Sequence, residues 1–231
     1  MPKSKISKPK RKTIVYVDGF NLYYCALKGS GYKWLDLMKV SQILLNDCEI
    51  IGIRYYTAHV SNNVSPTAPA DQAIYLNALK TLPNLEIILG RFQVTQKFMY
   101  LKKPLEFKPD STKIDIDPEP NVVKVVKTEE KGSDVNLGVQ LVRDAFLKKF
   151  EHAAVITNDT DLTEAIRIVE QEARLPVTLI CPEQIKSPAK SLQDVATTTK
   201  RLRLNTVCRA SQFPNSIITA NGNIINKPNS W

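Results

Sequence analysis

Residues 13–24, TIVYVDGFNLYY, carry the pattern that decides the fold. The first five of these residues are mostly β-branched or aromatic, which predicts a short buried strand. Asp18 and Gly19 follow at once and predict a turn, and the apolar residues of 20–27 predict a helix after it. A buried strand that runs directly into a helix is the unit from which parallel sheets are built.

The same alternation of strand and helix continues along the chain. Strands that alternate with helices of about 10–17 residues argue for a parallel sheet covered by helices on both faces. The predicted fold class is therefore α/β, with a central, mainly parallel sheet of about five strands. We expect the further strands at residues 49–58, 85–92, 153–157 and 177–181, and the further helices at residues 35–45, 71–82, 134–150 and 161–172.

Two segments lie outside this alternation. Residues 93–128 alternate in polarity, contain four prolines and show no helical pattern. They predict a β-rich insert of one or two hairpins that lies over the body of the domain. Residues 182–231 are expected to form a basic extension that packs on the domain formed by residues 13–181.

The net charge of +9 is unevenly distributed. Residues 1–12 hold six basic residues and no acid, and residues 182–231 hold seven basic residues against two acids. The body between them is mildly acidic. Basic flanks favour a polyanionic partner, whose bound cations are released on binding, although Lys-rich termini also keep proteins soluble. Residues 1–12 contain proline and few apolar residues, which predicts a disordered arm.

Several classes of protein are excluded or disfavoured by composition. No stretch approaches the roughly 18 apolar residues of a membrane span, and the basic N-terminus lacks the apolar run of a signal peptide. We therefore expect a cytoplasmic protein that does not enter a membrane, with reduced thiols. Two histidines rule out a three-His zinc site, and the four cysteines form no Cys-x-x-Cys pair. The nucleotide-binding and hydrolase motifs GxGxxG, GxxxxGK[ST] and GxSxG are missing from the sequence.

Acidic residues follow the predicted strands at the point where a parallel sheet places its reactive crevice. Asp18 directly follows the first strand, and Asp159 and Asp161 follow the strand at residues 153–157. Asp134 opens the helix that leads into that strand. Carboxylates gathered in one place repel one another unless a cation intervenes. Hard oxygen ligands without His or Cys select magnesium or manganese.

Each of these acids also has a purely structural explanation. Asp18 precedes a glycine, and Asp-Gly is an ordinary turn. Asp134 favours a helix N-terminus by its charge. Asp161 and Glu164 fit the spacing of a capping box, and Asp159 is a second candidate cap for the same helix.

Three blocks of the sequence resemble the signature blocks of the NYN domain family, in its LabA-like branch, within the PIN-like nuclease superfamily. They are VDGFNLYY (17–24), EEKGSDVNLGVQLVRDA (129–145) and VITNDTDLTEAIRIV (155–169). The segment SQFP (211–214) is similar to one found in the same branch. The resemblance covers roughly residues 13–181. It implies a PIN-like three-layer α/β/α fold, a site that depends on Mg²⁺ or Mn²⁺, and cleavage of RNA.

The resemblance also implies roles for single residues. The acids of the three blocks are expected to bind metal and to be catalytic, and the polar residues beside them to contact the substrate. The expected acids are Asp18, Asp134, Asp159 and Asp161, and the expected substrate contacts are Asn21, Lys131 and Asn158.

The chemistry expected of such a site is hydrolysis of a phosphodiester, which leaves a 5′-phosphate and a 3′-hydroxyl. A histidine-based ribonuclease would leave a cyclic phosphate instead.

The main alternative is an RNA-binding or adaptor module without activity. Toprim domains and HAD phosphatases also use acids, but Toprim domains have Glu after the first strand, and HAD phosphatases have a second Asp where this chain has Phe20. The RNA substrate, and whether the protein forms a homo-oligomer, stay open.

Aromatic residues near the first strand are candidates for stacking on single-stranded bases. Residues of this kind are more often part of the core. Tyr55 and Tyr56 are interpreted as core residues because they lie on a predicted strand. Tyr23, Tyr24 and Trp34 stay open between the two roles.

Overall fold

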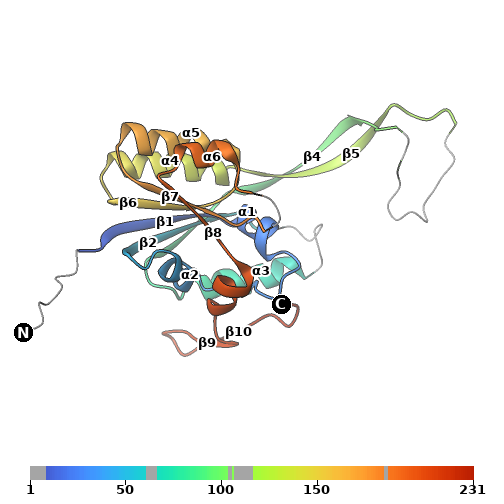
Figure 1. Ribbon diagram of the computed structural model, residues 1–231. Coiled ribbons are helices and arrows are strands. Elements are labelled where there is room, and N and C mark those ends of the chain that lie inside the picture. Colours follow the sequence, from blue (N-terminus) through green and yellow to red (C-terminus); the bar gives the residue numbers. More distant parts are fainter. Residues whose placement is uncertain (1–8, 61–66, 104–105, 107–116, 185–186) are drawn as a thin grey trace, which may run out of the picture.

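The computed structural model describes residues 9–60, 67–103, 106, 117–184 and 187–231 (Figure 1). Its strands are β1 (Arg11–Asp18), β2 (Cys48–Thr57), β3 (Leu85–Leu89), β4 (Arg91–Tyr100), β5 (Val122–Lys131), β6 (His152–Ile156), β7 (Val177–Cys181), β8 (Thr198–Arg201), β9 (Ser216–Ile218) and β10 (Ile224–Asn226). Its α-helices are α1 (Gly19–Leu22), α2 (Leu37–Leu44), α3 (Ala68–Leu79), α4 (Ser133–Phe146), α5 (Thr163–Arg167) and α6 (Lys190–Val195). Tighter or wider helical turns are η1 (Tyr23–Leu27), η3 (Thr160–Leu162), η4 (Ile168–Glu172) and η5 (Leu204–Cys208). None of the helices in these ranges combines the length and the apolar character that a bilayer crossing requires.

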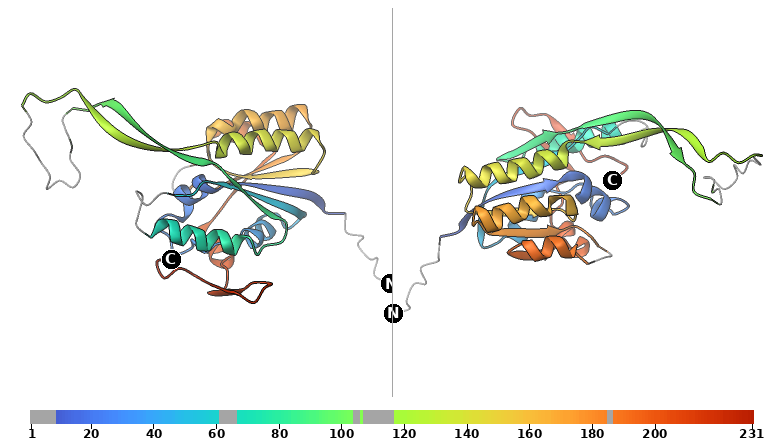
Figure 2. Two further views of the ribbon diagram at one scale, coloured as in Figure 1. Left: turned by 180° about the vertical axis from the view of Figure 1, so that it is seen from behind. Right: turned by 90° about the horizontal axis from the view of Figure 1, so that it is seen from above.

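The central sheet has the strand order β3-β2-β1-β6-β7-β8, and all neighbouring strands are parallel. Helices α4, α5 and α6 cover one face, and α2 and α3 cover the other (Figures 1 and 2). The predicted three-layer α/β/α architecture is confirmed. The sixth strand, β8, lies within residues 182–231, so the sheet extends beyond the boundary expected at residue 181.

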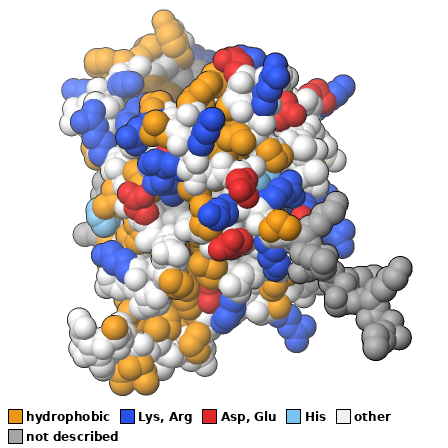
Figure 3. Space-filling model, turned by 90° about the vertical axis from the view of Figure 1, so that its left-hand side faces the viewer, with side chains coloured by type: hydrophobic (Ala, Val, Ile, Leu, Met, Phe, Trp, Pro, Cys, Tyr) orange, Lys and Arg blue, Asp and Glu red, His pale blue; other side chains and the backbone are white. Residues whose placement is uncertain are grey.

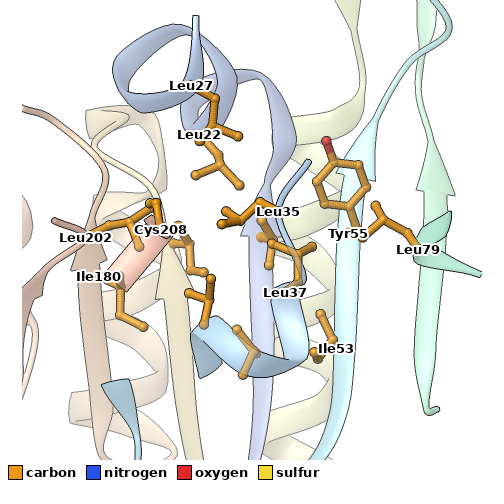
Figure 4. Close-up of a cluster of buried hydrophobic side chains, with 14 of the residues drawn as sticks. Leu22, Leu27, Leu35, Leu37, Ile53, Tyr55, Leu79, Ile180, Leu202 and Cys208 are labelled. Atoms are coloured by element: carbon orange, nitrogen blue, oxygen red, sulfur yellow. The ribbon is translucent and has the colours of Figure 1, made fainter. Parts of the chain in front are cut away.

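Strand β1 runs through the middle of the molecule and serves both hydrophobic layers. Val15 and Val17 face the layer of α2 and α3, whereas Ile14 and Tyr16 face the layer of α4, α5 and α6. Because successive side chains of a strand point to opposite faces, one fully apolar strand fills both cores. Figure 4 shows the first of these cores, in which side chains from β2 and β7 lie over one face of the sheet together with those of the segments that cover it.

The aromatic residues of this region are mostly buried. Tyr55 and Tyr56 are 7% and 1% exposed, which confirms their interpretation as core residues. Trp34 is completely buried, packs on Phe213 and donates a hydrogen bond to a backbone carbonyl. Tyr24 is 53% exposed, so Tyr24 keeps a surface on which a ligand can stack.

The insert forms one long antiparallel hairpin of β4 and β5, paired from Arg91 with Lys131 to Tyr100 with Val122. The pairing begins before residue 93 and ends after residue 128. The hairpin projects away from the three-layer body (Figures 1 and 2), so the expectation that it lies over the body is wrong. The reason is that β4 continues directly from the edge strand β3 through Gly90, and the twist of the pair carries it outward. Part of the insert, residues 104–105 and 107–116, lies outside the described residues.

Arg11 and Lys12, the last residues of the expected basic arm, belong to β1, and that part of the expectation is wrong. Arg11 and Lys12 are held there because they pair in register with the start of β2. Residues 1–8 lie outside the described residues. Figure 3 shows the face where β1 enters the sheet, on which Lys and Arg side chains are interspersed with acidic ones.

Helix α4 does not bury the valines Val135 and Val139, although their spacing in the sequence is that of one apolar face. Val135 and Val139 are 68% and 63% exposed, whereas Leu137 and Leu141 are completely buried. Leu137 and Leu141 are four residues apart and therefore lie on one face of the helix, toward the sheet.

Candidate active site

Three carboxylates from three different elements meet at one edge of the sheet. Asp18 ends β1, Asp159 follows β6, and Asp134 lies in the first turn of α4. Each offers one oxygen atom to a group in which these atoms all lie within 4.8 Å of one another. Strands β1 and β6 are neighbours, and the chain order reverses between them, which is where open parallel sheets form their binding crevice.

Asp18 is 3% exposed and is held by two hydrogen bonds. Its Oδ1 accepts from the backbone N–H of Asn21 at 2.9 Å and caps α1, and its Oδ2 accepts from the hydroxyl of Thr157 at 3.0 Å. Burial raises the pKa of Asp18 to about 7, and the negative charges of Asp134 and Asp159 act in the same direction. The two hydrogen bonds lower the pKa but do not offset burial.

Asp159 combines a cap with a place in the acid cluster. Its Oδ1 accepts from the backbone N–H of Asp161 at 3.0 Å and thereby caps η3. Its own N–H donates to Thr157 Oγ1 at 3.0 Å, so one threonine positions both Asp18 and Asp159. The prediction that Asp159 caps a helix is therefore confirmed. The same side chain also belongs to the acid cluster, so the two roles are compatible.

Asp161 lies apart from the cluster. It is exposed and is not among the three residues whose carboxylate oxygens converge. The capping-box interpretation of Asp161 with Glu164 is wrong as well. Helix α5 begins after Leu162 without a side-chain cap, and Glu164 instead pairs with Arg167 at 2.6 Å. The reason is that η3 takes up the first turn, and Asp159 caps that turn.

Asp134 is placed by the sharp change of direction between β5 and α4. Gly132 adopts a φ of 97°, a left-handed conformation that favours glycine, and α4 starts at the next residue. Burial raises the pKa of Asp134, and the charges of Asp159, Glu130 and Asp161 raise it further. A carboxylate in the first turn of a helix is otherwise favoured by the helix dipole.

Glu130 is an acid of this site that the sequence analysis missed. Its Oε1 accepts from the N–H of Ser133 at 3.1 Å, at the start of α4, and Glu130 lines the same cavity as the three aspartates. The signal was present in the sequence, because Glu130 belongs to the block at residues 129–145. The direction of the Glu130 side chain depends on the pairing of β4 with β5, which places Glu130 opposite Phe92.

The three expected substrate contacts have different positions. Asn21 lines the cavity, and its Oδ1 accepts from the N–H of Asn158 at 2.8 Å. Asn158 uses its own Oδ1 to accept from Ala189 N at 2.8 Å and ties the loop after β6 to the start of α6. Lys131 pairs with Glu129 at 3.5 Å. Lys131 follows Glu130 on β5, so its side chain points to the opposite face of the hairpin.

The acids border a cavity of about 370 Å³, which we call the acid cavity. Aromatic side chains form much of its remaining wall, and Phe20 and Phe92 meet edge to face at 5.7 Å. Its lining residues are Asp18, Phe20, Asn21, Tyr24, Cys25, Phe92, Glu130, Asp134 and Asp159.

The donor set of the acid cavity fits a hard divalent cation. All the converging ligand atoms are carboxylate oxygens, which magnesium and manganese prefer. Burial, and after it the charges of neighbouring acids, raises the pKa of Asp18 and Asp134, so their charged forms are unfavourable without a counter-charge. A cation between the carboxylates would supply this counter-charge. Asp18, Asp134 and Asp159 are therefore the residues that could hold a metal ion.

This chain matches the model of one protein family, and it is similar to a named protein and to a protein of known structure. The family model described as the NYN domain matches residues 12–202. A protein of Pseudomonas putida named 6-hydroxy-3-succinoylpyridine 3-monooxygenase is 30% identical over 198 residues, which cover 77% of this chain and 62% of that relative. The chain therefore spans less than two thirds of the length of that relative. A crystal structure of a protein of unknown function from Vibrio parahaemolyticus matches 84% of this chain and 94% of its own, with a TM-score of 0.50 and 16% identity, and shows the fold alone.

Proposed function

This chain belongs to the NYN domain family of the PIN-like superfamily, and we propose that it is a metal-dependent endoribonuclease. It hydrolyses RNA phosphodiester bonds and leaves a 5′-phosphate and a 3′-hydroxyl. One observation carries the proposal. Three carboxylates from β1, α4 and the loop after β6 converge within 4.8 Å at the crevice of a parallel sheet.

The side chains of the site have distinct tasks in this reaction. Asp18, Asp134 and Asp159 would hold a Mg²⁺ or Mn²⁺ ion, and such an ion would supply activation of a water molecule and neutralisation of charge on the scissile phosphate. Thr157 keeps Asp18 and Asp159 in position, since its hydroxyl donates to one and accepts from the backbone of the other. The amide group of Asn21 is oriented by its bond from Asn158 N and donates to a phosphate oxygen.

The bond changes are those of a simple hydrolysis. The water oxygen attacks phosphorus, and the bond from phosphorus to the 3′ oxygen breaks. The water loses one proton, and the departing 3′ oxygen gains one, so that a 3′-hydroxyl and a 5′-phosphate result. Neither histidine belongs to the acid cluster or lines the acid cavity, so the proposed reaction uses no histidine.

The experiment measures cleavage of a single-stranded RNA in Mn²⁺ by wild type and by Asp18→Asn, Asp134→Asn and Asp159→Asn. Each substitution keeps the shape of the side chain and removes its charge. Each should reduce the rate by at least about 10²-fold, as when one electrostatic stabiliser is removed from an active site. EDTA should abolish cleavage, and the new ends should carry 5′-phosphate rather than cyclic phosphate.

Two controls define the outcome. Asp161→Asn should retain most of the activity, since Asp161 is exposed and outside the converging group. Full activity in Asp18→Asn and Asp159→Asn would overturn the proposal. RNA binding without cleavage in Mn²⁺ would instead identify an adaptor module.

The name of the Pseudomonas putida relative is that of a monooxygenase and lends no support to RNA cleavage. The same purified protein is therefore also assayed for oxygen consumption with 6-hydroxy-3-succinoylpyridine and a two-electron reductant. Under the proposal, oxygen uptake stays at background. Turnover of the pyridine without any cleavage of RNA would favour oxidation instead.

A further inference from the structure

A second cavity of about 370 Å³ lies directly beside the acid cavity. Phe20 and Tyr24 line both cavities and form the wall between them. None of the metal-binding aspartates lines this second space. We call it the aromatic cavity, and its remaining ring-bearing walls are Tyr23, Tyr55, Tyr75 and Trp231.

The walls come from distant parts of the chain. Trp231 packs on Tyr75 of α3 with the ring centroids 5.5 Å apart. The C-terminal end of the chain lies beside α3 (Figure 1). Tyr55 comes from β2, and Figure 4 shows its ring beside Leu79 of α3. Phe20 and Tyr24 stack nearly parallel, 19° apart, on the side of the acids. Aromatic rings from several elements therefore line the cavity, and rings of this kind can stack on a planar ligand.

Two lysines stand over the aromatic walls. Lys28 Nζ lies 5.0 Å from the ring centroid of Tyr24, and Lys33 Nζ lies 5.7 Å from that of Trp231. Both residues line the cavity and can reach an anion bound at its mouth.

One carboxylate, that of Asp71 in the first turn of α3, lies within the lining of the aromatic cavity. Its Oδ2 accepts from the hydroxyl of Ser230 at 2.7 Å. A carboxylate disfavours a phosphate inside the cavity and accepts a hydrogen bond from a ring N–H or an exocyclic amine. The cavity therefore suits a planar heterocycle that carries N–H donors and is attached to an anionic group.

We infer that the aromatic cavity binds one nucleobase of the RNA strand, next to the phosphate at the acid cluster. The inference rests on the proposed function and adds a subsite to it. Because only the Phe20 and Tyr24 wall separates the two cavities, a single nucleotide spans them. A base enters the aromatic cavity only when it is unpaired, so the enzyme prefers single-stranded RNA.

The first experiment measures binding in EDTA, where no cleavage occurs. Calorimetry is performed with 5′-AMP, 5′-CMP, 5′-GMP and 5′-UMP, and with ribose 5-phosphate as the ligand without a base. The nucleotides should bind at least about 10-fold more tightly than ribose 5-phosphate, and Trp231→Ala should remove most of that advantage. Asp71→Asn should reduce the preference for bases with an exocyclic amine.

The matched control is Asp47→Asn. Asp47 precedes β2, at the end of the sheet away from both cavities, and pairs with Arg11 at the surface. This variant should bind all the nucleotides as wild type does. Ribose 5-phosphate binding as tightly as the nucleotides, or equal losses in Asp47→Asn and Asp71→Asn, would overturn the inference.

The second experiment uses wild-type enzyme and a set of RNA oligonucleotides in which a single abasic nucleotide is moved along the strand. One position beside the cleaved bond should raise KM by about 10-fold or more, and Trp231→Ala should abolish this position dependence. If the abasic nucleotide changed KM equally at every position, the inference would be overturned and the nuclease proposal would stay intact. Base-dependent binding without any cleavage would support the cavity and overturn the nuclease proposal.

Discussion

The pKa of Asp18 is set by two opposing effects. Two hydrogen bonds favour its charged form, and near-complete burial beside two other acids disfavours it. The balance is a pKa of about 7, well above the usual value of an aspartate. Without a cation, the charged carboxylate therefore destabilises the folded state.

The first prediction concerns the stability of the metal-free protein. Since the folded pKa of Asp18 lies above the unfolded one, its stabilising contribution is complete below about pH 4 and is lost as pH rises through about 7. The contribution of this residue should fall by on the order of 2 kcal/mol between pH 5 and pH 8. Asp18→Asn removes the titrating group, so its free energy of unfolding should exceed that of wild type at pH 8 and approach it at pH 5.

Urea unfolding in EDTA at the two pH values measures this difference. Burial lowers the pKa of His152 to about 4, so the protein loses stability at this residue as pH falls. This change is opposite in sign to the one at Asp18. His152 is present in both proteins, so its effect cancels in the comparison. A difference between the variant and wild type that does not change with pH would contradict the prediction.

At the scale of elements, the base of the β4–β5 hairpin determines where Glu130 and Asp134 lie. A Cβ at Gly90 would meet the carboxylate of Glu130 and would lie 2.9 Å from the carbonyl oxygen of Lys131 and 3.1 Å from Ser133 N. The backbone at Gly90, between β3 and β4, approaches the end of β5 and the start of α4 closely because no side chain separates them.

We predict that Gly90→Ala moves the start of α4 away from the acid cluster. The expected result is an affinity for Mn²⁺ reduced by about 10-fold, with stability lowered by about 1–3 kcal/mol, as for other overpacked sites. Calorimetric titration with Mn²⁺ measures the first effect and urea unfolding the second. Gly52→Ala is the control, because its Cβ would meet atoms no closer than 3.7 Å. Equal Mn²⁺ affinity in the two variants would contradict this role of Gly90.

The far end of α4 is held by a buried ion-pair network with no part in the acid cluster. Asp144 is completely buried and accepts from the hydroxyl of Tyr16 at 2.8 Å. It also pairs with Arg54 at 3.0 Å and with Lys149 at 3.1 Å. The network fixes α4 against β1 and β2.

Asp144→Asn should therefore lower the free energy of unfolding by about 2 kcal/mol, because it removes one of the two carboxylate partners of a largely buried Arg54 and leaves only the exposed Glu86. Its affinity for Mn²⁺ should be unchanged once folded. Asp18→Asn should show the reverse pattern, with lost Mn²⁺ affinity and a free energy of unfolding no lower than that of wild type. A loss of Mn²⁺ affinity in Asp144→Asn at temperatures where it is folded would contradict this separation.

At the scale of the whole molecule, the basic flanks remain a prediction about RNA affinity. Because Arg11 and Lys12 belong to the sheet, the segment that can be removed without damage to β1 is residues 1–8, which carry three lysines. Their removal should lower RNA affinity and reduce the slope of log affinity against log salt by about 2 for a single strand. Binding by the inactive Asp18→Asn protein between about 50 and 200 mM KCl measures the slope.

A full-length variant with Lys3, Lys5 and Lys8 replaced by Gln is the matched control, and it should behave as the truncated protein does. An unchanged slope in both would mean that the segment contributes only to solubility. A change in the truncated protein alone would point to a role other than charge.

The sequence by itself determined the α/β class, the parallel sheet and the place of Asp18 and Asp159 at one edge of that sheet. These follow from local patterns, because a β-branched run forms a strand and parallel strands end at the same edge. The acid that follows each such strand arrives at the crevice whatever the loops do. The three-layer PIN-like arrangement was implied by the resemblance to the NYN family.

Only the tertiary structure decided which neighbouring side chains face the acid cavity. Glu130 enters it and Lys131 does not, because the pairing of β5 with β4 sets which face each residue occupies. Asp161 stays outside because Asp159 caps the turn that precedes α5. Trp231 joins the aromatic cavity through packing on α3, a contact between residues more than 150 positions apart in the chain. Contacts of this kind depend on the packing of whole elements, which no local pattern records.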